Sequence, residues 1–203
     1  MANVSEKFNL NEVKISYRDL NSPLLFVVDM VNGFIKEGNM HDESINAISG
    51  DIEKLLNNIH PSIFICDAHD LSAKEFDAFP LHCVKNTSES EVIDELKDYV
   101  KNKYYKNSTN AFVNDDIRGA IDDSLDLYDD YIICGCCTDI CIMQFALSLN
   151  TYFNENDYKN KRVIVPINTC ETYDALNHNQ VLYNEMSLNL MKQSGIVVCE
   201  IGE

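Results

Sequence analysis

The segment YIICGCCTDICIMQFALSLN, residues 131–150, begins with a nearly continuous apolar run and then places apolar residues at helical spacing. A short apolar run of this kind is typical of a strand buried on both faces, and such strands belong to parallel sheets. The segment therefore predicts a buried strand that leads directly into a helix, with three cysteines at the junction.

The same alternation of strand and helix recurs along the chain. Apolar runs predict strands at 24–30, 62–66, 131–135, 162–167 and 195–201. Helical patterns lie between or after them, at 43–59, 88–100, 138–153 and 179–195. Repeated strand–helix units give a three-layer α/β/α fold with a mostly parallel, Rossmann-like sheet and right-handed crossovers.

Length and composition limit the class of protein. With 203 residues and 45% hydrophobic content, the chain can bury the core of one domain, and we expect residues 1–203 to form a single domain. Its first residues are polar and interrupted by charge, so they resemble neither a signal peptide nor a membrane anchor. We expect a cytoplasmic protein without a membrane partner, whose eight cysteines remain thiols.

The charge of the chain bears on its partners. The formal net charge is −17, with only 16 Lys and Arg residues, whereas binding to nucleic acid depends on neutralising phosphates with basic side chains. We therefore expect a small-molecule substrate and no nucleic-acid partner. The sequence leaves open whether the chain forms a homo-oligomer.

Reactive side chains follow three of the predicted strands. Asp29 comes at the end of the first, Asp67 and His69 follow the second, and the cysteines follow the third. In a parallel sheet the carboxyl ends of the strands share one edge, where ligands bind. Carboxylate, imidazole and thiol groups should therefore meet there.

The cysteines allow four interpretations: a structural zinc site, a redox pair, core packing and a catalytic nucleophile. A structural zinc site needs a second pair of closely spaced ligands, and a redox pair needs Cys-x-x-Cys; the sequence CCTDIC provides neither. Either Thr138 or Asp139 can cap the following helix, which places Cys141 in its first turn, where a thiolate is stabilised. The N–H groups of Cys137 and Cys141 could then form an oxyanion hole. Position alone leaves core packing of Cys141 equally open.

A second group of side chains has the composition of a metal site. Asp67 and His69 are two residues apart and should point the same way at a strand end, while Glu75 and His82 follow within the next loop. Two carboxylates and two imidazoles suit zinc, manganese or iron with a position left for water or substrate. The alternative is a polar loop with two unrelated histidines. Cys66 should face the opposite side of its strand and is not counted as a ligand.

Four motifs, LLFVVDMVNGF, DAHD…EF…FPLHCVKNT, KNSTNAF and GCCTDICIMQFAL, occur in order between Leu24 and about Ala175. Together they resemble the isochorismatase-like cysteine hydrolase superfamily, within it the nicotinamidase branch. The resemblance implies a cis peptide bond between Cys136 and Cys137. It also implies the following sites: a catalytic triad of Asp29, Lys106 and Cys141; one divalent metal ion, zinc foremost, at Asp67, His69, Glu75 and His82; and aromatic substrate contacts at Phe34 and Phe79.

The resemblance implies an amidohydrolase that converts nicotinamide to nicotinate and ammonia through a thioester. Glycines common in the family are replaced by Asn86 and Glu89, and Phe79 stands where Trp is frequent, which bears on the choice of substrate. Residues 1–22 have no counterpart and form a variable N-terminal segment. Two alternatives remain: a related hydrolase acting on another amide, a carbamoyl compound or isochorismate, and a non-enzymatic module that binds a partner.

Overall fold

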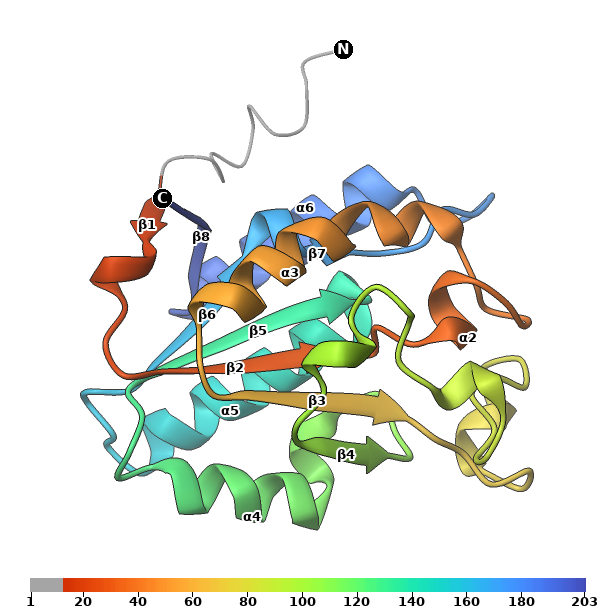
Figure 1. Cartoon of the computed structure of the whole chain (residues 1–203), viewed down its shortest axis with the longest axis horizontal. Coiled ribbons are helices and arrows are strands. Elements are labelled where there is room, and N and C mark those ends of the chain that lie inside the picture. Colours follow the sequence, from red (N-terminus) through yellow and green to blue (C-terminus); the bar gives the residue numbers. More distant parts are fainter. Residues whose placement is uncertain (1–12) are drawn as a thin grey trace.

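Parallel strands form the centre of the molecule. The computed structural model describes residues 13–203, and its eight-stranded sheet has the order β1-β8-β6-β5-β2-β3-β4, with β7 paired to β5 (Figure 1). Every strand pair is parallel. The strands are β1 (Lys14–Ser16), β2 (Pro23–Val28), β3 (Ser62–Asp67), β4 (Lys103–Lys106), β5 (Asp130–Cys136), β6 (Arg162–Pro166), β7 (Cys170–Glu171) and β8 (Val197–Gly202). The predicted parallel α/β architecture is confirmed, and each of the five apolar runs overlaps a strand whose bounds differ from it by at most two residues.

Helices cover both faces of this sheet. The helices are α2 (Asn32–Ile35), α3 (Ser49–Asn58), α4 (Asp115–Ser124), α5 (Met143–Glu155) and α6 (Gln180–Gln193). Side chains alternate along β2, so that Leu25 and Val27 pack in the core under α3. Phe26 and Val28 face the opposite way, into the core formed with α4, α5 and α6. Figure 1 shows α3 and α4 on opposite sides of the sheet.

The predicted helix at 88–100 is wrong. Only two short 3₁₀ turns form there, η5 (Ser88–Ser90) and η6 (Lys97–Tyr99). The backbone between them bonds to a distant segment: the Glu91 carbonyl accepts from Asn32 N, and Ile93 N donates to the Met30 carbonyl. These long-range hydrogen bonds take the partners that a continuous helix would need. The apolar spacing that suggested a helix instead buries Ile93 and Leu96 in the core.

Several elements, among them β1, β4 and α4, have no counterpart in the sequence expectations. Strands β1 and β4 lie at the two edges of the sheet, and α4 begins at Asn114, whose side chain accepts hydrogen bonds from the N–H groups of Asp116 and Ile117. Strand β1 lies within the predicted variable segment 1–22 and pairs with β8. The first 12 residues of that segment lie outside the described residues.

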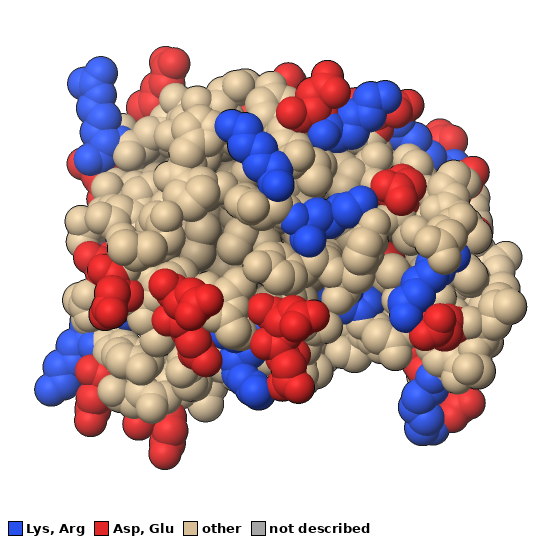
Figure 2. Space-filling model, turned by 60° about the horizontal axis from the view of Figure 1, so that its bottom comes forward, with Lys and Arg blue, Asp and Glu red and all other residues tan. Residues whose placement is uncertain are grey.

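The surface carries both signs of charge. Figure 2 shows acidic and basic side chains interspersed around one face of the molecule. Within residues 13–203, none of the helices combines the length and the apolar character needed to cross a bilayer.

Candidate active site

The reactive side chains meet at the carboxyl edge of the sheet. Asp29 follows β2, Asp67 ends β3 and Lys106 ends β4, where it is the register partner of Asp67. Cys141 lies in a one-turn π-helix, η8 (Thr138–Ile142), which connects β5 to α5. The predicted convergence is therefore confirmed, and all four side chains are buried.

Lys106 is the electrostatic centre of this group. Its Nζ lies 2.8 Å from Asp29 Oδ2 and 3.7 Å from Cys141 Sγ, and it also donates a hydrogen bond to Asp67 Oδ1. Although burial lowers the pKa of a lysine, Asp29 and Asp67 outweigh this effect and hold the pKa of Lys106 well above its ordinary value. A permanent cation therefore lies beside two carboxylates and a thiol.

The two groups expected to exchange a proton have shifted pKa values. Burial, together with the charge of Asp67, raises the pKa of Asp29 to about 7, against the opposing effect of Lys106. Burial also raises the pKa of the Cys141 thiol, and Lys106 only partly offsets this. Burial therefore outweighs the effect of Lys106, and the pKa of the thiol stays well above its ordinary value. Asp29 lies within hydrogen-bonding reach of that thiol.

The start of the helix differs from the expected capping. Cys137 is the N-cap residue and provides no side-chain hydrogen bond, while its carbonyl accepts from the N–H groups of Ile140 and Ile142, at 3.1 Å each. The carboxylate of Asp139 bonds instead to Thr172 and His178, which lie far along the chain. The prediction that Thr138 or Asp139 caps the helix is therefore wrong, although Cys141 does lie in its first turn.

The chain before this turn passes very close to β2. Gly135 has φ +118°, and a Cβ atom added there would lie 2.0 Å from the carbonyl oxygen of Val28. Only glycine allows this approach. One residue further on, the Cys136–Cys137 peptide bond is cis, in agreement with the resemblance. The thiol of Cys136 donates to the carbonyl of Asp29 at 3.1 Å, so the two strand ends are joined beside the thiol of Cys141.

Asp67, His69, Glu75 and His82 form one compact cluster. Their potential ligand atoms all lie within 4.8 Å of one another. His69 Nδ1 bonds to Asn107 Oδ1 at 2.9 Å and His82 Nδ1 bonds to the Pro80 carbonyl at 2.7 Å, so Nε2 of each ring is free to accept. The buried Nε2 of His69 has no hydrogen-bond partner among residues 13–203. A divalent cation would satisfy this atom, and the four donors fit one.

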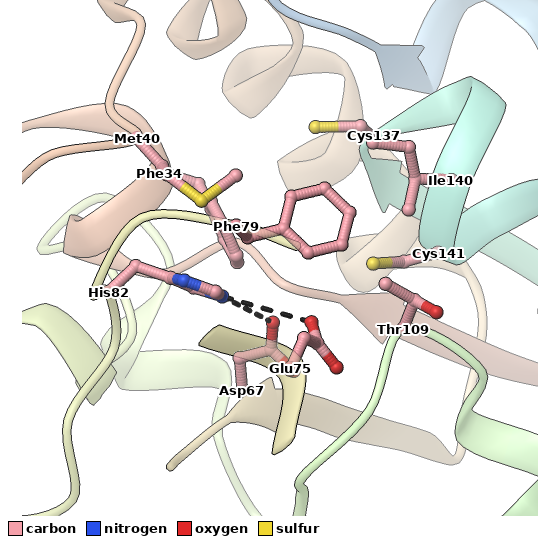
Figure 3. A pocket seen from close by; sticks show the side chains of 10 residues that line it. All are labelled: Phe34, Met40, Asp67, Glu75, Phe79, His82, Thr109, Cys137, Ile140 and Cys141. Carbon is pink, nitrogen blue, oxygen red and sulfur yellow. Dashed lines mark ion pairs between the residues drawn. The ribbon is translucent and has the colours of Figure 1, made fainter. Parts of the chain in front are cut away.

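A small pocket connects this cluster to the cysteines. It is narrow, with a cavity volume of about 20 Å³. Figure 3 shows the Cys141 sulfur pointing into it from one side and His82, Asp67 and Glu75 facing it from the other, with the ring of Phe79 between them. Phe34 also lines the pocket. The two predicted aromatic residues, the Cys141 thiol and three of the four predicted metal ligands, Asp67, Glu75 and His82, thus share one cavity.

Several side chains at the site were not singled out from the sequence. Met40, Thr109 and Ile140 line the same pocket. Phe76 packs edge-on against both histidines, with ring centroids 5.3 Å from His69 and 5.5 Å from His82. Apolar and hydroxyl residues of this kind carry no local sequence signal for a site, because what marks them is only their position in the folded chain.

The chain resembles known proteins over most of its length. The family model described as the isochorismatase domain matches residues 23–202. "Nicotinamidase 1" of Arabidopsis thaliana is 26% identical over 205 residues, which cover 86% of this chain and 84% of that protein.

Two solved structures show the same fold. PnC1 from L. infantum, in complex with nicotinate, has a TM-score of 0.71 at 17% identity, covering 90% of this chain and 98% of its own. N-carbamoylsarcosine amidase from Thermoplasma acidophilum has a TM-score of 0.61 at 23% identity, covering 89% and 95%. Because the family match spans nearly all of the described residues, the chain belongs to the isochorismatase family of hydrolases.

Proposed function

We propose that this isochorismatase-family hydrolase converts nicotinamide to nicotinate and ammonia. The observation that carries the proposal is a single small pocket with the Cys141 thiol on one side and the cluster containing Asp67 and His82 on the other. A flat ring between Phe34 and Phe79 would present its carboxamide to the thiol and its ring nitrogen to the cluster.

In the first half of the reaction, the Cys141 sulfur attacks the carboxamide carbon while Asp29 takes the thiol proton. The pKa of Asp29, raised to about 7, suits a base that works near neutral pH. The C–N bond then breaks, and Asp29 returns the proton to the departing ammonia. A thioester to Cys141 remains, and water hydrolyses it to the carboxylic acid and the free thiol.

Lys106 and the backbone of η8 would stabilise the charges that develop. Lys106 Nζ, 3.7 Å from the sulfur, favours the thiolate as the proton leaves. The N–H groups of Cys137 and Cys141 lie at the start of η8, where backbone donors lack helical partners, and we assign them to the oxyanion.

Asp67, His69, Glu75 and His82 would hold one divalent ion per chain, with zinc favoured by the two imidazoles and manganese or iron as alternatives. Such an ion supplies a position at which a ring nitrogen of the substrate can be held. Lys106 and His69 outweigh the effect of burial and keep the pKa of Asp67 well below its usual range, so this ligand is ionised.

We expect the double variant His69→Ala, His82→Ala to lose the bound ion, because it removes both imidazole ligands. Metal analysis of protein purified without chelator should find about one divalent ion per chain in the wild type and far less in the variant. His60→Ala, which removes an exposed imidazole elsewhere, is the matched control and should retain the ion. If the wild-type protein contains no ion and its activity does not change when metal is added, this part of the proposal is wrong.

The substrate itself is tested by comparing nicotinamide with benzamide, which lacks the ring nitrogen. We expect kcat/KM for benzamide to be lower by at least about 10²-fold, because a site built around a polar group of its substrate rejects analogues without that group. Ammonia release measures both reactions. Equal turnover of the two amides would indicate a broader amidase.

A second candidate is an amidase for carbamoyl compounds, which the fold shared with N-carbamoylsarcosine amidase favours. Such a substrate has no aromatic ring to lie against Phe34 and Phe79. Release of ammonia from N-carbamoyl amino acids, with none from nicotinamide, would select this candidate. Consumption of isochorismate without release of ammonia would instead indicate a hydrolase that acts on isochorismate.

A further inference from the structure

His178 is enclosed by aromatic and acidic partners next to the active site. Its ring stacks between Tyr173 and Tyr183, with centroid distances of 3.8 Å on each side. Its Nδ1 lies 2.9 Å from the Tyr173 carbonyl, and its Nε2 lies 2.8 Å from Asp139 Oδ2. The side chains of both His178 and Asp139 are only 9% exposed. Both ring nitrogens and both ring faces of His178 are thus engaged.

The hydrogen bonds define the state of the ring. A backbone carbonyl can only accept, so Nδ1 of His178 donates to the Tyr173 carbonyl. The bond between Nε2 and Asp139 then needs a single proton between the two groups. The ring therefore has a fixed orientation, with an aromatic face on each side and the Asp139 carboxylate at its edge.

Asp139 connects His178 to the turn that carries the nucleophile. It lies two residues before Cys141 in η8, a turn whose N-cap has no side-chain hydrogen bond. Its other carboxylate oxygen accepts from Thr172 Oγ1 at 2.5 Å. The conformation of the turn is therefore held by contacts with the segment 172–179, which we call the strap.

The strap is itself fixed at several points. Gln180 Nε2 donates to the Thr172 carbonyl at 2.7 Å, and Asp174 N donates to Asp42 Oδ2 at 2.9 Å. Tyr173 lines an outer pocket that shares Phe34 and Cys137 with the inner one. The strap thus borders a pocket that adjoins the site, and it holds the turn that carries Cys141.

We propose that Asp139 and His178 are a positioning pair, which holds the η8 turn so that the Cys141 sulfur and the backbone N–H groups beside it face the substrate carbonyl. This inference concerns the same site as the proposed hydrolysis and rests on that function for its catalytic consequence. Neither residue touches the substrate or the reacting atoms. The ring of the substrate is held by side chains from other elements, so loss of the pair should affect turnover rather than substrate binding.

The test uses Asp139→Ala and His178→Phe in the full chain. The phenylalanine keeps the stack between Tyr173 and Tyr183 and removes both hydrogen bonds. We expect each variant to lower kcat for nicotinamide, and the rate at which iodoacetamide alkylates Cys141, by about 10- to 100-fold, since small misplacements of a reacting group have effects of this size. KM should remain nearly unchanged.

Two further variants separate positioning from general stability. In Asp139→Asn, the amide can donate to Nε2 of a neutral His178 while its oxygen still accepts from Thr172, so this variant should retain most of the wild-type rate. The double variant Asp139→Ala, His178→Phe should lower kcat and the alkylation rate by no more than the more damaging single variant does. Both substitutions remove the same hydrogen bond between Asp139 and His178, so their effects should not add. Wild-type kcat and alkylation rates in the single variants, or fully additive losses in the double variant, would overturn the proposal.

Arg162→Met is the matched control for stability. It removes an ion pair with Asp130, 2.6 Å long, at the other end of the sheet, and should lower the melting temperature without changing kcat. If His178→Phe does not fold, Tyr183→Leu removes one face of the stack at a partly exposed position and should still slow alkylation of Cys141. An unchanged rate in Tyr183→Leu would then count against the pair.

Alkylation of Cys141, followed by peptide mass spectrometry, requires no substrate. If the wild type does not release ammonia from nicotinamide, the proposed function fails, while the alkylation rates still decide whether Asp139 and His178 position the thiol.

Discussion

Replacing Cys141 by alanine is expected to abolish ammonia release from nicotinamide, with kcat falling by roughly 10⁶-fold, the scale seen when a hydrolytic triad loses its nucleophile. Cys141 points into the pocket beside Lys106 and Asp29, where we expect its sulfur to form the thioester. The measurement is ammonia release at saturating nicotinamide. Cys199→Ala, which removes a fully buried thiol from β8, controls for the general cost of losing a core cysteine and should remain active.

Cys137 is the strongest alternative candidate for the nucleophile, because its side chain lines the same pocket. We expect iodoacetamide to label Cys141 fastest of the eight cysteines, since Lys106 lies beside its sulfur. Faster labelling of Cys136 or Cys137, combined with an active Cys141→Ala variant, would show that the nucleophile is a different thiol.

The second large effect concerns the base. We expect Asp29→Asn to lower kcat by about 10²- to 10⁴-fold, the usual contribution of a positioned general base, while leaving the fold unchanged. The asparagine has nearly the same shape and can still accept the hydrogen bond from Asp67 N. It cannot take the proton of a thiol whose pKa burial holds above its ordinary value.

Two measurements separate this role from a structural one. The melting temperature of Asp29→Asn should stay close to that of the wild type, and alkylation of Cys141 should slow, because the thiol has lost its proton acceptor. Asp122→Asn, at an exposed carboxylate in α4 that bonds to Tyr152, is the matched control and should match the wild type in both rates. Undiminished ammonia release from Asp29→Asn would mean that another group takes the proton.

Local sequence was sufficient for the parallel sheet. Runs such as residues 24–30 and 131–135 consist almost wholly of apolar residues, and only a strand covered by helices on both faces buries every position of such a run. Once the strands are parallel, their carboxyl ends share an edge, so Asp29, Asp67 and the cysteines had to meet there. The sequence by itself therefore determined the fold class and the edge that carries the candidate site.

The segment 88–100 shows where this reasoning fails. Its apolar spacing is compatible with a helix, but hydrogen bonds to Met30 and Asn32, some 60 positions away, hold it as short turns. The spacing of apolar residues indicates which side chains are buried, and two different backbone conformations can bury the same side chains. Strand β4 was missed for a related reason: it is short and lies at the edge of the sheet, where fewer residues need to be apolar.

Only the tertiary structure decided the chemistry at the site. Nothing near Lys106 in the sequence, apart from the family resemblance, shows that its ammonium lies between Asp29 and Asp67. Likewise, Asp139 had the sequence of a helix cap, yet its carboxylate bonds to His178, 39 positions away. Burial also raises the pKa of the Cys141 thiol, since desolvation outweighs the nearby lysine. Burial and long-range contacts depend on how distant segments pack, and for that reason no local pattern could supply them.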